Sequence, residues 1–167
     1  MAFKHLALGL VACALVAPVA LSAKAKVGKP APAFDLVTYD KQKVKLADLK
    51  GKVVVINHWA TWCGPCKAEM PMMSAFHRRY RAAGFEIFGV TTEDSVPEAK
   101  LKAVAAALSY PLVRRFNGAG YPVLDGVPTT YIIDRAGTVR YAHAGAFDGR
   151  EFTRLILPLL AEKPPAP

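Results

Sequence analysis

Hydrophobic and polar positions change their period at the segment NHWATWCGPCKAEMP, residues 57–71. Immediately before the cysteines, residues 53–56 form a continuous apolar run, which is typical of a strand buried on both faces. From Cys63 up to Gly84, apolar side chains recur at helical intervals, at Met70, Met73, Phe76 or His77, and Tyr80. The pattern predicts a buried strand, a loop that carries two cysteines, and a helix, in that order.

Further elements are predicted on either side of this unit. After the proline-rich residues 28–33, residues 34–49 alternate apolar and polar side chains around a polar turn, which indicates a β-hairpin. Residues 85–92, FEIFGVTT, have the composition of a second buried strand. Residues 95–98, Ser-Val-Pro-Glu, have the spacing of a capping box, so we expect an alanine-rich helix to begin there and to end near Leu108.

The C-terminal part is predicted to contain a hairpin and a last helix. Residues 129–134 and 138–144 flank a turn, and residues 148–151 can cap a helix that runs through Leu160. Strands that alternate with helices and end in a hairpin indicate an α/β fold built around a mixed sheet. The length of 167 residues, 53% of them hydrophobic, fits one domain with one core.

The N-terminus has the parts of a secretory signal peptide. A basic start precedes sixteen uncharged, mostly apolar residues, 6–21, and small side chains follow at positions 22, 23 and 25. The apolar run is shorter than the ~20 residues that a membrane-spanning helix needs. We therefore expect a leader at residues 1–23, or 1–25, one folded domain at 24–162, and a frayed tail at 163–167.

Two alternatives stay open for this leader. The apolar run could remain as an uncleaved anchor, and the segment Leu-Val-Ala-Cys that ends at Cys13 weakly resembles the box at which bacterial lipoproteins are lipidated. After cleavage we expect a soluble protein that is periplasmic or otherwise exported, and membrane tethering is the alternative location.

The charge pattern does not suggest a nucleic-acid partner. The chain holds 22 Lys and Arg and 13 Asp and Glu, a net charge of +9, and removal of the leader takes away only Lys4, which leaves +8. The charges are scattered, and no basic stripe is interleaved with aromatic residues. We expect a solvated surface, with contact to an anionic membrane or an acidic partner as the weaker alternative.

Without the leader the chain keeps two cysteines, Cys63 and Cys66, in a compartment where oxidation is possible. As a structural staple the pair is poorly placed, because a disulfide that closes about four residues stabilises by only ~2 kcal/mol, against ~3 kcal/mol for fifteen residues. A structural zinc site needs four ligands, of which this pair supplies two, and the histidines at positions 58, 77 and 143 lack ligand spacing. We therefore expect no bound metal and a pair of reactive thiols.

Each residue of the motif suits thiol-disulfide exchange. Cys63 stands at the predicted start of a helix, where unpaired N–H groups and the positive end of the helix dipole favour the thiolate. Cys63 would attack a substrate disulfide, and Cys66, one turn later, would displace the substrate from the mixed disulfide. Gly64 lets the active-site turn close tightly, and Pro65, which lacks an N–H, fits the first helical turn without losing a hydrogen bond.

The motif WCGPC after a buried strand resembles the thioredoxin superfamily. VGKPAPAFDL upstream, Glu69 in CKAEMP, and GVPTTYIIDRAGTVRY downstream narrow the resemblance to the TlpA/ResA-like (redoxin) secreted thiol-disulfide oxidoreductases. The resemblance covers essentially all of the chain after the leader. It implies a thioredoxin fold, with a central mixed β-sheet flanked by helices and an N-terminal β-hairpin extension. We expect no cofactor.

The resemblance also implies roles for residues outside the cysteine pair. In the family, a downstream proline is cis and packs beside the sulfurs, and the backbone of the residue before it pairs with the substrate chain. Carried over, this makes Pro128 the cis proline and Val127 a substrate contact. Trp62 is expected to shape the rim of the site and to contact the substrate.

One position departs from cytosolic thioredoxin. Where thioredoxin has a buried aspartate that accepts the proton of the second cysteine, this chain has Asn57, which cannot titrate. The family carries a glutamate three residues after the second cysteine, and Glu69 matches it, so we expect Glu69 to have a raised pKa and to shuttle the proton of Cys66. The alternative is a carboxylate on the helix surface that pairs with a lysine. His58, where the family is commonly apolar, has no explanation in the sequence.

The direction of electron flow is inferred from the residues between the cysteines. Gly-Pro resembles reducing thioredoxin, with a potential of about −270 mV, more than strong oxidants at about −120 mV. We therefore expect a reductase. The family implies that a membrane-embedded electron donor re-reduces the pair, and that the targets are disulfides in exported proteins, with apocytochrome c as the commonest example.

Two other activities stay open as alternatives. A peroxiredoxin-like peroxidase shares the proline-rich N-terminal segment, but its reactive cysteine follows the pattern P-x-x-x-T/S-x-x-C, and the segment before Cys63 has no such proline. A copper-binding or copper-delivery module would use a longer cysteine loop and a distal histidine, for which His143 is the candidate. Otherwise we expect His143 to be structural.

Overall fold

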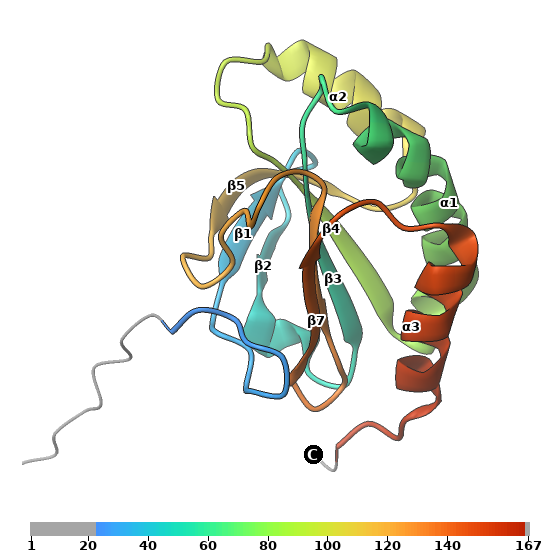
Figure 1. Cartoon of the computed structure of the whole chain (residues 1–167). Coiled ribbons are helices and arrows are strands. Elements are labelled where there is room, and N and C mark those ends of the chain that lie inside the picture. Colours follow the sequence, from blue (N-terminus) through green and yellow to red (C-terminus); the bar gives the residue numbers. More distant parts are fainter. Residues whose placement is uncertain (1–22, 166–167) are drawn as a thin grey trace, which may run out of the picture.

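The computed structural model describes residues 23–165. Residues 1–22 of the predicted leader, Cys13 among them, lie outside the described residues, as do the last two residues of the predicted tail. The described chain forms one sheet and three α-helices (Figure 1). Within it, no helix is both long enough and apolar enough to cross a membrane.

The sheet is mixed, as predicted. Its strands lie in the order β2-β1-β5-β4-β3-β6-β7. Neighbours β3 and β4, and β4 and β5, run parallel, whereas the other four pairs are antiparallel. The strands are β1 (Asp35–Thr38), β2 (Lys43–Lys45), β3 (Val53–Trp59), β4 (Phe85–Thr91), β5 (Leu112–Asn117), β6 (Thr129–Ile133) and β7 (Val139–Ala144).

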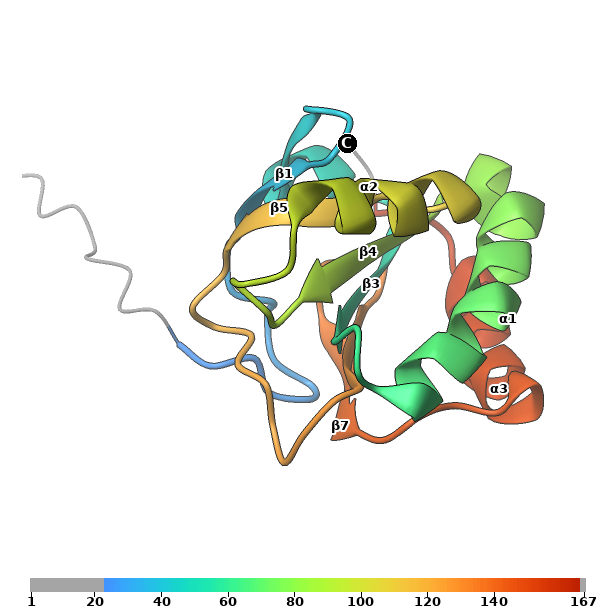
Figure 2. The same cartoon turned by 90° about the horizontal axis from the view of Figure 1, so that it is seen from above.

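All three α-helices pack on one face of this sheet. They are α1 (Gly64–Tyr80), α2 (Glu98–Ala107) and α3 (Gly149–Ala161), and Figure 2 shows them gathered on one side of the strands. Met73, Leu101 and Phe152, one from each helix, are buried in a single hydrophobic cluster with residues of β3 and β4. This arrangement places the start of α1 and the start of α3 beside the end of β3.

Strand β3 is buried along its whole length, as its apolar run predicted. Because successive side chains of a strand point to opposite faces, Val55 and Trp59 join the cluster under the helices, whereas Val54 and Ile56 join a second cluster on the other face. That second cluster is completed by the N-terminal segment, by the 3-10 helix Leu46–Leu49 and by the loop between β5 and β6, through Phe34, Leu49 and Tyr121.

One predicted helix cap is confirmed, one is wrong, and one strand was missed. Asp148 caps α3, since its carboxylate accepts from the N–H groups of Arg150 and Glu151, both at 2.8 Å. The capping box expected at residues 95–98 does not form: α2 begins at Glu98 with Pro97 as its N-cap and no side-chain cap. Strand β5 was not predicted, although it joins the N-terminal hairpin to β4.

Arg135 ties three segments together at the end of the sheet where β3 begins. Its guanidinium donates to the carbonyl oxygens of Gly51 at 2.6 Å, Ala83 at 2.8 Å and Leu160 at 2.9 Å. The side chain is largely buried, and its three acceptors come from the turn before β3, the end of the 3-10 helix after α1, and the end of α3. A single side chain thus links three separate segments at this end of the domain.

Candidate active site

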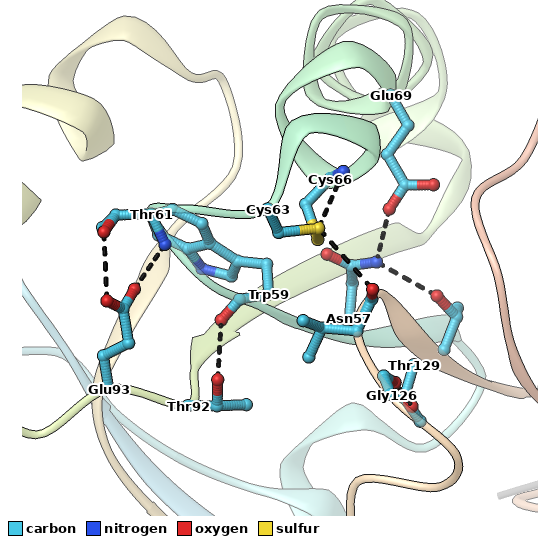
Figure 3. The surroundings of a disulfide bond; sticks show 12 residues. Asn57, Trp59, Thr61, Cys63, Cys66, Glu69, Thr92, Glu93, Gly126 and Thr129 are labelled. Atoms are coloured by element: carbon cyan, nitrogen blue, oxygen red, sulfur yellow. Dashed lines mark hydrogen bonds between the residues drawn. A yellow bond between two sulfur atoms is a disulfide. The ribbon is translucent and has the colours of Figure 1, made fainter.

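The two cysteines lie at the junction between β3 and α1, at the opposite end of the sheet from Arg135. Cys63 is the N-cap of α1, and its Sγ accepts from the backbone N–H of Cys66 at 3.1 Å. The two sulfurs form a disulfide with a bond length of 2.03 Å (Figure 3). The predicted helix start is confirmed, and Pro65 occupies its first turn.

The peptide bond between Val127 and Pro128 is cis, which agrees with the geometry that the resemblance implied. The Val127 carbonyl oxygen lies 3.6 Å from Cys63 Sγ, so this loop touches the disulfide directly (Figure 3). Thr129 fixes the loop, because its hydroxyl donates to the Gly126 carbonyl at 2.5 Å and accepts from the Leu124 N–H at 3.2 Å.

The loop before Cys63 is held from the other side by the end of β4. Glu93 accepts a hydrogen bond from the Thr61 N–H and another from the Thr61 hydroxyl, the latter at 3.1 Å. The Thr92 N–H donates to the Trp59 carbonyl at 2.9 Å. Sequence reasoning missed Glu93, because a glutamate in a loop 30 residues after the motif gives no sign that it folds back onto it.

Three large apolar side chains are exposed in the two loops that meet at the disulfide, and we call them the apolar rim. Trp62, next to Cys63, is 70% exposed, and Val123 and Leu124, in the loop that leads to the cis proline, are about 40% exposed. The disulfide itself is well covered, with Cys63 at 3% and Cys66 at 0% exposure. Of the two cysteines, Cys63 is therefore the more exposed, and exposed apolar side chains occur in both loops that hold it.

Glu69 is buried one turn below Cys66, with only 3% of its surface exposed. Its Oε1 accepts from Asn57 Nδ2 at 2.9 Å and its Oε2 accepts from the Phe147 N–H at 3.0 Å. Burial raises the pKa of Glu69 above its usual value, and the two hydrogen bonds offset that rise only in part. The alternative of a surface carboxylate paired with a lysine is wrong.

Asn57 stands on β3 directly under the cysteine turn and is fully buried. Its Nδ2 donates to Glu69 Oε1 and also to the Thr130 hydroxyl at 3.0 Å. Its Oδ1 is buried and has no hydrogen-bond partner among residues 23–165. Sequence reasoning singled out Asn57 and Glu69 separately, and the structure brings them into contact.

The histidines take no part in this cluster. His58 points to the opposite face of the sheet, packed edge-on against Phe116 and Tyr131, and burial lowers its pKa to about 4. His143 is exposed on β7 beside Tyr141. Over the described part of the chain, no three His, Cys, Asp or Glu side chains gather as metal ligands.

Comparison with known proteins finds the same fold and the same chemistry. The sequence model of the AhpC/TSA family matches residues 27–142. The thioredoxin-like protein YneN of Bacillus subtilis is 36% identical over 128 residues, which span 74% of this chain and 75% of that protein. The thiol-disulfide oxidoreductase ResA of Bacillus cereus is 33% identical over 118 residues, 70% of this chain and 68% of that protein.

A solved structure has the same fold. The crystal structure of a putative thiol:disulfide interchange protein DsbE from Chlorobium tepidum superposes with a TM-score of 0.67 at 28% identity. The superposition covers 83% of this chain and 100% of that one.

Proposed function

The chain belongs to the AhpC/TSA family and is a TlpA/ResA-like thiol-disulfide oxidoreductase of the thioredoxin superfamily, and on that premise we propose that it reduces disulfides in exported proteins. One observation carries the proposal: the Cys63–Cys66 disulfide closes the first turn of α1 against the cis Val127–Pro128 bond. The predicted leader supports export, and apocytochrome c is the target we would test first.

In the proposed cycle the reduced pair gives two electrons to the substrate disulfide. Cys63 attacks as a thiolate, favoured by its position as N-cap of α1 and by the hydrogen bond that its Sγ accepts from the Cys66 N–H. One substrate sulfur leaves as a thiol and the other forms a mixed disulfide with Cys63. Cys66 then attacks Cys63, releases the second substrate thiol and closes the disulfide seen here.

The substrate chain would lie on the apolar rim formed by Trp62, Val123 and Leu124. The Val127 backbone, next to the Cys63 sulfur, supports a role for Val127 and Pro128 in pairing with the extended chain beside the substrate cysteine. Gly64 and Pro65 form the exposed turn over the disulfide, so the substrate can approach from that side.

We propose that Glu69 accepts the proton that Cys66 loses during resolution. A buried thiol attacks only as the thiolate, so its proton must leave at the moment of resolution. Glu69 lies one turn away and is buried, and burial raises its pKa, which fits a carboxylate that takes up a proton more readily than an exposed glutamate does. No charged side chain is paired with it among the described residues, so its proton affinity can respond to Cys66.

The direction of electron flow is tested by the reduction potential of the pair, measured by equilibration with glutathione or dithiothreitol buffers. A value of about −230 mV or lower supports a reductase that needs an electron donor, which we take to be embedded in the membrane. A value of about −120 mV would overturn the proposal in favour of an enzyme that introduces disulfides. The Cys66→Ser variant should trap the exported substrate as a mixed disulfide on Cys63.

The role of Glu69 is tested by the rate at which a mixed disulfide between Cys63 and a model peptide is resolved, as a function of pH. Glu69→Gln should slow resolution and flatten its pH dependence. Glu86→Gln is a matched control. Glu86 is a partly buried glutamate at the start of β4, the end of the sheet away from the cysteines, and contact with His77 and Lys52 lowers its pKa. A pH profile of Glu69→Gln that matches the wild type would refute the role of Glu69.

A further inference from the structure

The Asn57 carboxamide lies between the disulfide and the Glu69 carboxylate (Figure 3). One edge of the amide is fully used, since Nδ2 donates both to Glu69 and to the Thr130 hydroxyl. The other edge is not: Oδ1 is buried and meets no donor within the described chain. A buried carbonyl without a donor is rare in folded proteins and costs free energy, so this edge needs a physical reason.

The redox state of the cysteines supplies that reason. In the disulfide neither sulfur carries a hydrogen, so the cysteine pair offers Oδ1 no donor through its side chains. Reduction adds a hydrogen to Cys66, and a thiol is a weak donor. The unused acceptor of Asn57 therefore faces a group that gains and loses its proton during every turnover.

An asparagine side chain cannot titrate, but it can turn over. A rotation of 180° exchanges its donor and acceptor edges while its shape hardly changes. The contacts of Asn57 allow both orientations, because the Thr130 hydroxyl can accept from Nδ2 or donate to Oδ1. Glu69 has the same freedom: ionised it accepts from Nδ2, and protonated it can donate to Oδ1.

We propose that Asn57 is a positioning residue whose carboxamide turns over when a proton passes from Cys66 to Glu69. This inference rests on the proposed role of Glu69. Before transfer, the Cys66 thiol donates to Oδ1 and Nδ2 donates to the Glu69 carboxylate. After transfer, the protonated Glu69 donates to Oδ1 and Nδ2 donates to the Cys66 thiolate. One proton moves from sulfur to oxygen, no electrons are exchanged, and every polar atom has a partner in both states.

Among the described residues, few titratable groups face Glu69, so its proton affinity depends mainly on Asn57 and Cys66. The titratable groups that face it are Cys66 on the same helix and the phenols of Tyr110, before β5, and Tyr141 on β7. Burial raises the pKa of both phenols, so they are uncharged at physiological pH. Asp148, next to Phe147, is exposed, and its carboxylate already accepts hydrogen bonds from the backbone N–H groups at the start of α3. No cation competes with Asn57 for the carboxylate in the described structure.

The test follows two NMR signals of the full-length protein through a pH titration, in the oxidised and in the reduced state. One is the carboxyl carbon of Glu69 and the other is the side-chain NH2 of Asn57. In the wild type we expect the midpoint of the Glu69 titration to differ between the two redox states, and the Asn57 NH2 signal to move with that midpoint in both. An Asn57 signal that does not move as Glu69 titrates would overturn the proposal.

A variant separates coupling through Asn57 from simple proximity. In oxidised Asn57→Leu, Glu69 loses a donor to its charged form, so its proton affinity should rise roughly tenfold, which is the effect of one charge-assisted hydrogen bond. The difference between the redox states should shrink at the same time. Asn117→Leu is the matched control, since Asn117 also donates to a carboxylate, that of Asp35 at 3.0 Å, on the exposed part of β5. A redox-linked difference as large in Asn57→Leu as in the wild type would overturn the proposal.

If Asn57→Leu does not fold, Thr130→Val replaces it. Loss of the hydroxyl removes the partner that stabilises both amide orientations, so the Asn57 NH2 signal should respond less to the Glu69 titration than in the wild type, and an equal response would count against the proposal. The role of Glu69 and the rotation of the Asn57 amide can be refuted separately. If Glu69→Gln leaves resolution unchanged, the proposed function of Glu69 fails; if it flattens the profile while the Asn57 signals do not follow, only the amide rotation fails.

Discussion

The most direct physical test of the fold concerns His58, the one residue for which the sequence offered no explanation. It is 5% exposed on β3, on the face away from the helices. Burial lowers its pKa from 6.5 to about 4, and a hydrogen bond to the Tyr121 backbone offsets this only in part. His58 is therefore a neutral core residue at physiological pH, in a place where an apolar ring would also fit.

The sign of the resulting pH dependence follows from proton counting. Between pH about 4 and 6.5 the unfolded chain holds a proton on this ring and the folded chain does not, so the free energy of unfolding rises with pH across this window. The difference of about 2.5 pH units corresponds to about 3 kcal/mol, at about 1.4 kcal/mol per unit. Acidification from pH 7 to pH 4 should remove about that much stability, through His58 alone.

The variant His58→Phe isolates this contribution. Phenylalanine keeps the ring contacts with Phe116 and Tyr131 but cannot be protonated. We would measure urea unfolding of the oxidised protein by tryptophan fluorescence from pH 4 to pH 8, and subtract the variant from the wild type so that all other titrating groups cancel. The difference should grow by about 3 kcal/mol between pH 4 and pH 6.5. His143→Phe is the control, because water reaches that ring in the folded and the unfolded chain.

If the difference in free energy of unfolding between wild type and His58→Phe does not change with pH, His58 is not a buried ring that folding keeps neutral. Such a result would mean that the folded protein takes up a proton at His58 without cost, and therefore that water or a structural change relieves the buried charge. A curve of opposite slope would be equally contradictory, because only a ring that gains a partner on folding loses stability as pH rises.

Four further outcomes are expected. Burial raises the pKa of Glu69, so the free energy of unfolding should fall by up to about 1.4 kcal/mol per pH unit as pH rises above 4.5, and urea titrations of Glu69→Gln should lack this fall. Arg135→Met should lose about 3 kcal/mol in urea unfolding, at about 1 kcal/mol for each of three hydrogen bonds, with no change of the reduction potential. Asp148→Ala should cost about 1 kcal/mol in thermal unfolding, and Asp148→Asn much less, because asparagine caps helices nearly as well. Glu93→Ala should speed hydrogen exchange at the Thr61 amide roughly tenfold, and an unchanged rate would show that the carboxylate does not hold the loop.

The parts of the site that could be predicted from the sequence are those set by neighbouring residues. The start of α1 at the motif follows from a buried run, a tight turn and helical spacing, all within residues 53–84. The cap at Asp148 is local as well, since its partners are two and three residues away. The cis geometry before Pro128 came from the resemblance and not from local chemistry.

The parts that escaped prediction depend on distant partners. Strand β5 has no alternating pattern, because the exposed Arg114 and Arg115 follow two buried residues, and its place is set by pairing with β1 and β4. The contact between Asn57 and Glu69 joins a strand to a helix, and its geometry arises only when both pack together. The serine expected to cap α2 lies outside the helix because the proline after it takes the N-cap position.

Helix α3 connects the two ends of the molecule. Its first turn adjoins the Glu69 cluster, and its last turn is fastened by Arg135 at the far end of the sheet, about 20 Å away at 1.5 Å per residue. The chain beyond it emerges on the side opposite the cysteine turn (Figure 1). A linker fused after Pro165 would therefore fix the protein to an electrode or a bead with its sulfurs facing outward. The same polarity would let redox titrations be read as a current from an oriented layer of protein.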